Sequence, residues 1–167
     1  MAKESFKVIA TAIIRKGNKY LIAQRAAHEK LYPSRWTVPG GGLEDQDVDE
    51  SLALADGQVY EVLVGLLQRE VREEVGLEIG YLRYVTSLCY GFPTPRLCIS
   101  FCADHVSGEV VLSDELVDFA WVTSQEAVRY ELLSGIHEEL FIADDVFAGR
   151  PIREWTYYQG LVRDAKK

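Results

Sequence analysis

The chain has little cysteine and no long apolar run, and both shortages exclude classes of protein. Its 167 residues include three cysteines, Cys89, Cys98 and Cys102, an odd number with no CxxC pair. A disulfide framework or a cysteine-based zinc site is therefore not expected. No apolar run is long enough to cross a bilayer, and the first residues lack the layout of a signal peptide. The cytoplasm is the expected location.

The chain also lacks an excess of positive charge. Its formal net charge is −8, and 48% of its residues are apolar. An acidic chain is repelled by phosphate backbones and anionic lipids, so we expect neither nucleic acid nor membrane as a partner. The length fits one domain with its own core. We expect a small-molecule partner, and a homodimer remains a further alternative.

Hydrophobic periodicity predicts strands before and after a central helix. Residues 6–25 are expected to form a hairpin that turns at 16–19, and residues 60–75 have helical spacing. This order favours an α+β fold or an α/β sandwich. Further strands are expected at 36–38, 77–90, 96–104 and 107–123, and helices at 124–130 and 136–146. The basic, aromatic tail, residues 148–167, is expected to pack on the domain or on a second subunit.

The helix over residues 60–75 would gather three carboxylates on one face. Glu70, Glu73 and Glu74 are related as i, i+3 and i+4, within an arc of roughly 100°. Such carboxylates repel one another unless a cation lies between them, and Mg²⁺ prefers oxygen ligands of this kind. The alternative is a solvated acidic face with arginines nearby. Beside the carboxylates, an apolar stripe would face the core: Val64, Leu67, Val71 and Val75.

The surrounding residues resemble a known family. Residues 69–77, REVREEVGL, match the second half of the Nudix box, G-x5-E-x7-R-E-U-x-E-E-x-G-U, where U is a bulky aliphatic residue. Glu61 lies eight residues before Arg69, as the box requires, but Ala55 stands where the box has glycine. If Gly41 is the box glycine, 20 steps separate it from Glu61 where the family has six. The resemblance therefore implies an acidic insertion of 14 residues, placed at 45–58.

The resemblance implies an α/β/α sandwich with a mixed β-sheet over residues 1–147, followed by the tail. It also implies hydrolysis of the diphosphate linkage between a nucleoside diphosphate and another group X. Glu70, Glu73 and Glu74 would bind Mg²⁺, with Mn²⁺ as the alternative ion. Glu73, Glu74 or Glu115 would accept the proton of the attacking water. A Nudix-fold sensor that binds a nucleotide without hydrolysing it is the rival hypothesis.

Other residues have supporting roles in this hypothesis. Glu61 and Arg69 are expected to pair and brace the loop against the helix, and Gly76 to end the helix. Gly41 and Gly42 would bring backbone N–H groups close to an anionic substrate. Arg25 is a candidate for a substrate phosphate, although a surface ion pair is the more ordinary role. Four aromatic residues are candidates for stacking on a base, or else for core and rim positions: Tyr32, Trp36, Tyr90 and Phe92.

Overall fold

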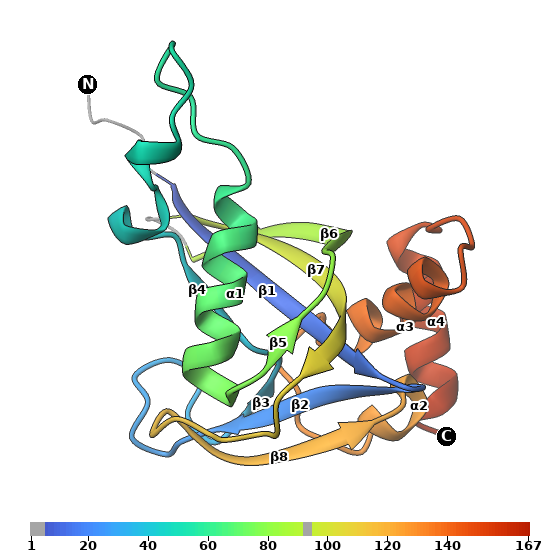
Figure 1. Cartoon of the computed structure of the whole chain (residues 1–167). Helices are drawn as coiled ribbons and strands as arrows, with labels where there is room; N and C mark the ends of the chain where they lie inside the picture. Colours follow the sequence, from blue (N-terminus) through green and yellow to red (C-terminus); the bar gives the residue numbers. More distant parts are fainter. Residues whose placement is uncertain (1–5, 92–94) are drawn as a thin grey trace.

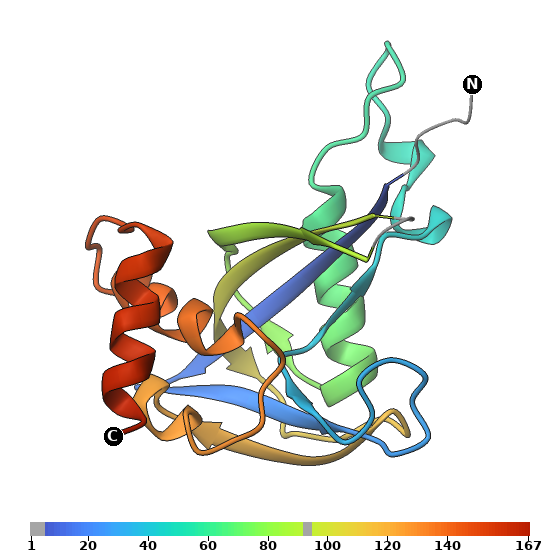
Figure 2. The same ribbon diagram turned by 180° about the vertical axis from the view of Figure 1, so that it is seen from behind.

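A computed structural model describes residues 6–91 and 95–167 (Figures 1 and 2). Its strands are β1 (Lys7–Lys16), β2 (Lys19–Arg25), β3 (Trp36–Thr37), β4 (Gly40–Gly42), β5 (Glu78–Ile79), β6 (Arg83–Tyr90), β7 (Arg96–Ser107) and β8 (Leu116–Val122). Its helices are α1 (Val62–Val75), α2 (Ser124–Ala127), α3 (Ile136–Phe147) and α4 (Trp155–Ala165), with two short 3-10 turns, η1 (Asp45–Asp47) and η2 (Glu50–Leu52).

The sheet is mixed. Strands β1 and β7 run parallel in its centre, in register from Lys7 opposite Arg96 to Arg15 opposite Asp104. The other strand pairings are antiparallel: β2 and β4 pair with β1, β5 and β6 pair with β7, and β3 and β8 pair with β2. The predicted hairpin is present, with Gly17 in the left-handed conformation at its turn. The mixed sheet and the α+β class are confirmed.

Helices cover both faces of this sheet (Figures 1 and 2). Alternation along β1 explains how: Ala12 and Ile14 belong to the apolar cluster under α1, whereas Ile13 belongs to the cluster under α3 and α4. Tyr20 and Leu21 of β2 divide in the same way. The central strands are therefore buried on both faces, and the α/β/α layering follows from this alternation.

Helix α1 differs from the expected helix at its start. It begins at Val62 because Glu61 has left-handed backbone dihedrals, with φ of 59°. Leu66, rather than Val64, completes the buried stripe with the residues Leu67, Val71 and Val75. At the other end, Gly76 has φ of 71° and its N–H bonds to the carbonyl of Arg72. Its left-handed conformation lets the chain leave the helix and enter β5.

The C-terminal segment contains a helix that pattern reasoning left undefined. Helix α4 packs on α3, and its Tyr158 is fully buried. The Tyr158 hydroxyl donates to Asp145 at 2.8 Å and accepts from the Arg153 N–H at 2.9 Å. Arg150 donates to the same aspartate at 2.6 Å. Within residues 6–91 and 95–167, no helix is long and apolar enough to span a bilayer.

Candidate active site

Strand β4 brings the glycine-rich turn against the glutamates of α1. A Cβ atom at Gly41 would collide with the Glu70 carboxylate, and one at Gly40 would collide with the backbone of Ala10. The Gly40 N–H donates to Oε2 of Glu74 at 2.9 Å. A side chain at Gly40 would push β4 away from β1, and one at Gly41 would displace the Glu70 carboxylate. The sequence pattern PGGGLE therefore serves the close approach of β4 to both carboxylates.

Glu74 is the most perturbed carboxyl of α1. Only 9% of the residue is exposed, and burial raises its pKa to about 8. The negative charges of Glu70 and Glu115 add to this shift, whereas the Gly40 N–H and Arg25 oppose it. A carboxylate that is desolvated beside other acids is stabilised by any cation that enters. The site therefore favours binding of positive charge at Glu74.

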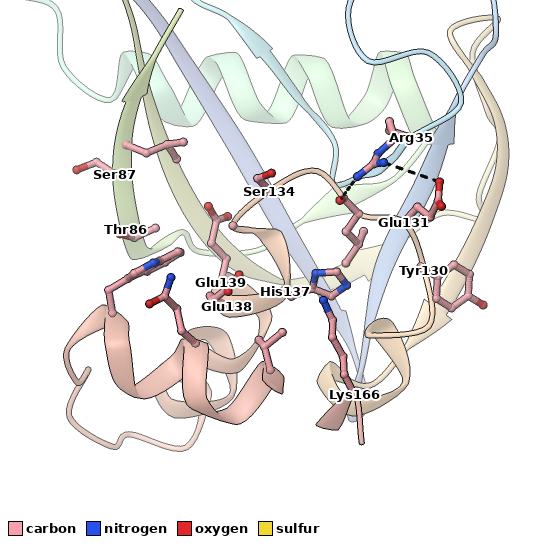
Figure 3. A pocket seen from close by; sticks show the side chains of 16 residues that line it. Arg35, Thr86, Ser87, Tyr130, Glu131, Ser134, His137, Glu138, Glu139 and Lys166 are labelled. Carbon is pink, nitrogen blue, oxygen red and sulfur yellow. Dashed lines mark hydrogen bonds and ion pairs between the residues drawn. The ribbon is translucent and has the colours of Figure 1, made fainter. Parts of the chain in front are cut away.

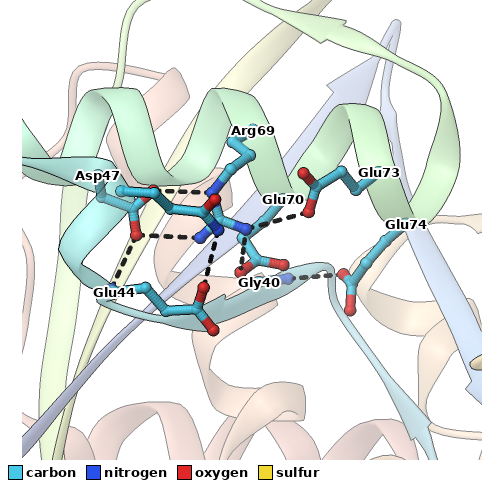
Figure 4. A network of polar contacts seen from close by, with 8 residues as sticks. Gly40, Glu44, Asp47, Arg69, Glu70, Glu73 and Glu74 are labelled. Atoms are coloured by element: carbon cyan, nitrogen blue, oxygen red, sulfur yellow. Dashed lines mark hydrogen bonds and ion pairs between the residues drawn. The ribbon is translucent and has the colours of Figure 1, made fainter.

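Glu70 and Glu73 are held by one arginine (Figure 4). Arg69 Nη1 lies 3.0 Å from Glu70 Oε1 and 3.0 Å from Glu73 Oε2. The Glu70 side chain is 14% exposed, and burial raises its pKa even with Arg69 adjacent. The Glu73 side chain is 59% exposed. Among the described residues, no three His, Cys, Asp or Glu side chains converge tightly enough to hold a metal as they stand.

The expected pairing of Arg69 with Glu61 is wrong. Arg69 instead binds both carboxylate oxygens of Asp47, at 2.7 and 3.0 Å, and the Asp47 side chain is only 2% exposed. Glu61 is exposed, and eight helical residues place it about 12 Å along the axis from Arg69. Asp47 was missed by pattern reasoning, although it follows Gly41 by six steps, the spacing that the box gives to its first acid.

The loop before β8 lies at the C-terminal end of α1. The Ser113 N–H donates to the Glu74 carbonyl at 2.9 Å, and the Ala26 N–H donates to the Glu115 carbonyl at 2.8 Å. These bonds tie the loop to both α1 and β2. The Glu115 side chain is exposed and acts electrostatically on Glu74. The structure therefore brings Glu115 into the environment of Glu74, as a separate and solvated carboxylate.

Glu74 borders a cavity of about 620 Å³, a volume suited to a small ligand. Strand β4 and Arg25 also line this cavity, and apolar walls come from Ile9, Val38 and Ile136. Arg25 forms an ion pair with Glu29 at 2.7 Å. Arg25 thus lines the cavity while it is paired with Glu29, and its contact with a substrate phosphate stays a prediction.

The aromatic candidates have different environments. Tyr32 and Tyr90 line the cavity. Trp36 packs edge-on against Tyr130, with ring centroids 4.8 Å apart. Phe92 lies outside the described residues.

Figure 3 shows a second cavity. It has a volume of about 750 Å³ and lies among β6, α3 and α4. The two cavities share four lining residues: Arg35, Leu88, Ser134 and Glu139. No glutamate of α1 lines the second cavity. Of these two cavities, the smaller is therefore the candidate active site, because Glu74 lines it together with apolar side chains.

The site thus combines strand β4, whose three residues are glycines, with the α1 glutamates and the cavity beside them. A family comparison agrees with this arrangement. The NUDIX domain family matches residues 5–143. The chain belongs to the Nudix hydrolase family. The NAD-capped RNA hydrolase NudC of Haemophilus influenzae (strain PittGG) is 32% identical over 71% of this chain and 40% of its own length. The chain thus spans well under half of that relative.

For two further similar proteins, the match covers more of the other protein's length. The nucleoside triphosphatase NudI of Escherichia fergusonii is 26% identical over 75% of this chain and 88% of its own length. The crystal structure of a MutT NUDIX hydrolase from Burkholderia pseudomallei superimposes with a TM-score of 0.65. That match has 17% identity and covers 83% of this chain and 98% of the other. The structural likeness confirms the fold.

Proposed function

We propose that the protein is a Mg²⁺-dependent pyrophosphohydrolase that cleaves the diphosphate linkage of a nucleoside diphosphate joined to another group X. One observation carries this proposal: the buried carboxyls of Glu70 and Glu74 meet the glycine strand at the mouth of a cavity of about 620 Å³. A diphosphate placed there would lie next to the α1 carboxylates, which favour a bound cation, and its organic group would enter the apolar part of the cavity.

The carboxyl set fits a hard divalent cation. Burial raises the pKa of both Glu70 and Glu74, so their ionised forms are stabilised by a positive charge. Glu73 would join them by leaving Arg69, which its exposed side chain can do. When bound, Mg²⁺, or Mn²⁺ in its place, neutralises diphosphate oxygens and lowers the pKa of a coordinated water. The phosphates would lie next to Arg25 and strand β4, where Gly41 and Gly42 are the predicted contacts.

We assign the proton-accepting role to Glu115. Glu73 is paired with Arg69, and Glu74 accepts a hydrogen bond from Gly40. Glu115 is exposed beside Glu74 and is not committed to a comparable contact among the described residues. A solvated carboxylate on a loop is able to receive the proton of the attacking water and pass it to solvent. Glu73 and Glu74 remain the alternative bases.

We also propose that Asp47 takes the place of the first acid of the box. Its bidentate ion pair holds Arg69, which in turn contacts Glu70 and Glu73. The 14 extra residues would then follow Asp47 rather than begin at residue 45, and Glu61 would belong to them. In this arrangement Asp47 positions the metal-binding face through Arg69, and the insertion 48–61 is a loop beside the site.

The relatives bear on the substrate. NudC is named for NAD-capped RNA and NudI for nucleoside triphosphates, so both names describe phosphoanhydrides of nucleosides. We propose a small nucleotide of this kind as the substrate, because the cavity has a volume of only about 620 Å³ and is lined by the backbone of β4 and by Ile136 and Glu139 of α3. The absence of nucleic-acid and membrane partners, the homodimer and the cytoplasmic location stay predictions.

One observation favours the rival, a binding module without turnover. Arg69 holds both Glu70 and Glu73, and among the described residues no three carboxylates converge. A site that never binds metal would have this arrangement. If Glu70, Glu73 and Glu74 are to hold a cation together, Arg69 would have to leave at least one of the first two carboxylates.

Turnover of a substrate panel separates the two functions. Nucleoside triphosphates, nucleotide sugars and dinucleotides are incubated with Mg²⁺, and release of nucleoside monophosphate or phosphate is measured for the parent, Glu73→Gln and Glu154→Gln. Glu154 is exposed at the start of α4 and serves as the charge-matched control. We expect turnover by the parent and by Glu154→Gln that collapses in Glu73→Gln. Ligand binding without turnover across the panel would establish the rival.

A further inference from the structure

Glu139 of α3 is a buried acid in the layer between this helix and the sheet. Only 4% of the residue is exposed, yet it lines the same cavity as Glu74. It projects from α3 into the space between this helix and the sheet (Figure 3). The charged neighbour that acts on it is another acid, Glu138, and no ion pair to Glu139 is found in residues 6–91 and 95–167. A hydrogen bond from Ser100 favours the ionised form, but no cation among the described residues compensates its charge, so a ligand that donates hydrogen bonds to this carboxylate would stabilise it.

The sheet places further polar groups opposite Glu139. Thr11 of β1 and Ser100 of β7 are register partners on the central parallel pair, and the Thr11 hydroxyl donates to Ser100 at 3.0 Å. Both line the cavity, on the same face of the sheet as the buried residues Ile13 and Cys102. Ser100 is itself 1% exposed. A group of polar side chains from two strands and α3 therefore lines the cavity between the sheet and this helix.

We propose that Glu139, with Ser100 beside it, selects a substrate whose base presents two adjacent N–H donors, the arrangement of the ring N–H and exocyclic amine of guanine. This inference rests on the proposed function, because it names the base of the nucleotide bound at that site. The phosphates would lie at Glu74 and Arg25, and the base would enter between the sheet and α3. Apolar side chains of Ile9 and Ile136 would face the base.

The chemistry of a carboxylate decides among the bases. An ionised carboxylate only accepts hydrogen bonds, and its two oxygens match two parallel donors. Adenine and cytosine present a donor next to an acceptor, and uracil presents one N–H between two carbonyl oxygens. Against each of these, one carboxylate oxygen would face another acceptor or remain unpaired. Burial raises the pKa of Glu139 to about 7, so the carboxylate is the main form at pH 8.

Binding of monophosphates to the intact protein tests this assignment without any hydrolysis. Calorimetric titrations at pH 8 compare GMP with IMP, which lacks the exocyclic amine, and with AMP. Loss of one hydrogen bond to a charged group predicts that IMP binds the parent at least about tenfold more weakly than GMP. Equal affinity of the parent for GMP and IMP would overturn the proposal, and this comparison needs no variant.

A substitution at Glu139 gives the second arm. The amide of Glu139→Gln offers one donor and one acceptor, which match adenine. We expect Glu139→Gln to bind GMP at least about tenfold more weakly than the parent, with AMP binding retained or improved, whereas Glu154→Gln binds as the parent does. Unchanged GMP affinity in a folded Glu139→Gln protein would overturn the proposal. Turnover without preference for guanine would contradict this inference alone, and guanine-selective binding without turnover would contradict the proposed function alone.

Discussion

Glutamates border the candidate site from two helices, and their surroundings differ. On α1, Glu70, Glu73 and Glu74 occur together, and Arg69, which Asp47 holds in place, compensates part of the charge of Glu70 and Glu73. On α3, Glu139 is buried without a cation among the described residues. The first arrangement suits exchange of Arg69 for a metal ion, and the second suits recognition of donors on a ligand. The same side chain thus supports two different tasks, and its neighbours decide which.

The largest expected effect is on the α1 side of this comparison. Glu74→Gln removes the most buried carboxyl of the cluster while keeping its shape, so the divalent cation loses a ligand. We expect turnover to fall roughly 10³-fold, about 4 kcal/mol of transition-state stabilisation. Steady-state rates with saturating Mg²⁺ measure this loss. A Glu74→Gln protein with the parent's rate would show that α1 holds no catalytic metal.

The next effect concerns stability on the α3 side. The pKa of Glu139 in the folded protein, about 7, lies above its ordinary value of 4.5. Below about pH 4.5 the carboxyl is neutral in both states and costs no folding stability. As the pH rises through 7, the free energy of unfolding falls, because the unfolded state ionises more readily. Relative to the parent, we expect Glu139→Gln to be about equal at pH 4 and more stable by up to about 3 kcal/mol at pH 8.

Urea unfolding of the parent and of Glu139→Gln across this pH range measures the difference. Glu138→Gln, at the partly exposed neighbour on the same helix, is the control for the loss of one negative charge. A stability difference between Glu139→Gln and the parent that stays constant from pH 4 to pH 8 would contradict the burial of an unpaired acid.

A smaller effect sharpens the role of Asp47. Asp47→Asn weakens the ion pair that holds Arg69, and residues that orient metal ligands typically contribute 10- to 100-fold in affinity or rate. We expect a loss in this range, about 1 to 3 kcal/mol, in the apparent Mg²⁺ affinity measured from turnover. Asp47→Glu should preserve most of the function, because a longer carboxylate can still reach Arg69.

Glu61→Gln is the matched control for Asp47→Asn. Glu61 is exposed and is not a partner of Arg69 in the structure, so its substitution should leave the Mg²⁺ dependence unchanged. If Glu61→Gln is impaired and Asp47→Asn is not, the first acid of the box is Glu61 after all.

The smallest effect lies away from the site, where α4 packs on α3. Tyr158→Phe removes the hydroxyl that bridges Asp145 and the Arg153 N–H. One such hydrogen bond contributes about 1 kcal/mol, so we expect a decrease of this size in the free energy of unfolding. Denaturant unfolding measures it, and turnover should remain at the parent's level. A loss of turnover without a loss of stability would place α4 in the site.

Local patterns predicted much of the fold because they depend on residues close in sequence. The hairpin around Gly17, the helix that bears Glu70 and the strand with Ser100 all follow from periodicity and turn residues. The mixed sheet was also expected. Helix α4 was not, because its aromatic and basic residues also suit an interface with another chain. Its burial depends on contacts between Tyr158 and α3 that no local pattern contains.

In the candidate site, too, some residues follow from local spacing and others only from long-range packing. The spacing of the α1 glutamates identified that cluster without structural information. The partner of Arg69 was misassigned because Glu61 has the right distance in sequence, whereas Asp47 is brought to Arg69 by the path of the loop. The sequence did not indicate that Glu139 belongs to the site. An acid within an apolar helix is expected to be exposed, and only the packing of α3 on the sheet buries it. Long-range packing decides both residues.

Binding of Mn²⁺ tests the central distinction between the two helices most directly. Electron paramagnetic resonance titrations would compare the parent with Glu70→Gln, Glu74→Gln and Glu139→Gln. We predict that both α1 variants bind Mn²⁺ at least about tenfold more weakly, whereas Glu139→Gln binds it as the parent does. Equal Mn²⁺ affinity in the parent and both α1 variants, or a loss confined to Glu139→Gln, would contradict the account.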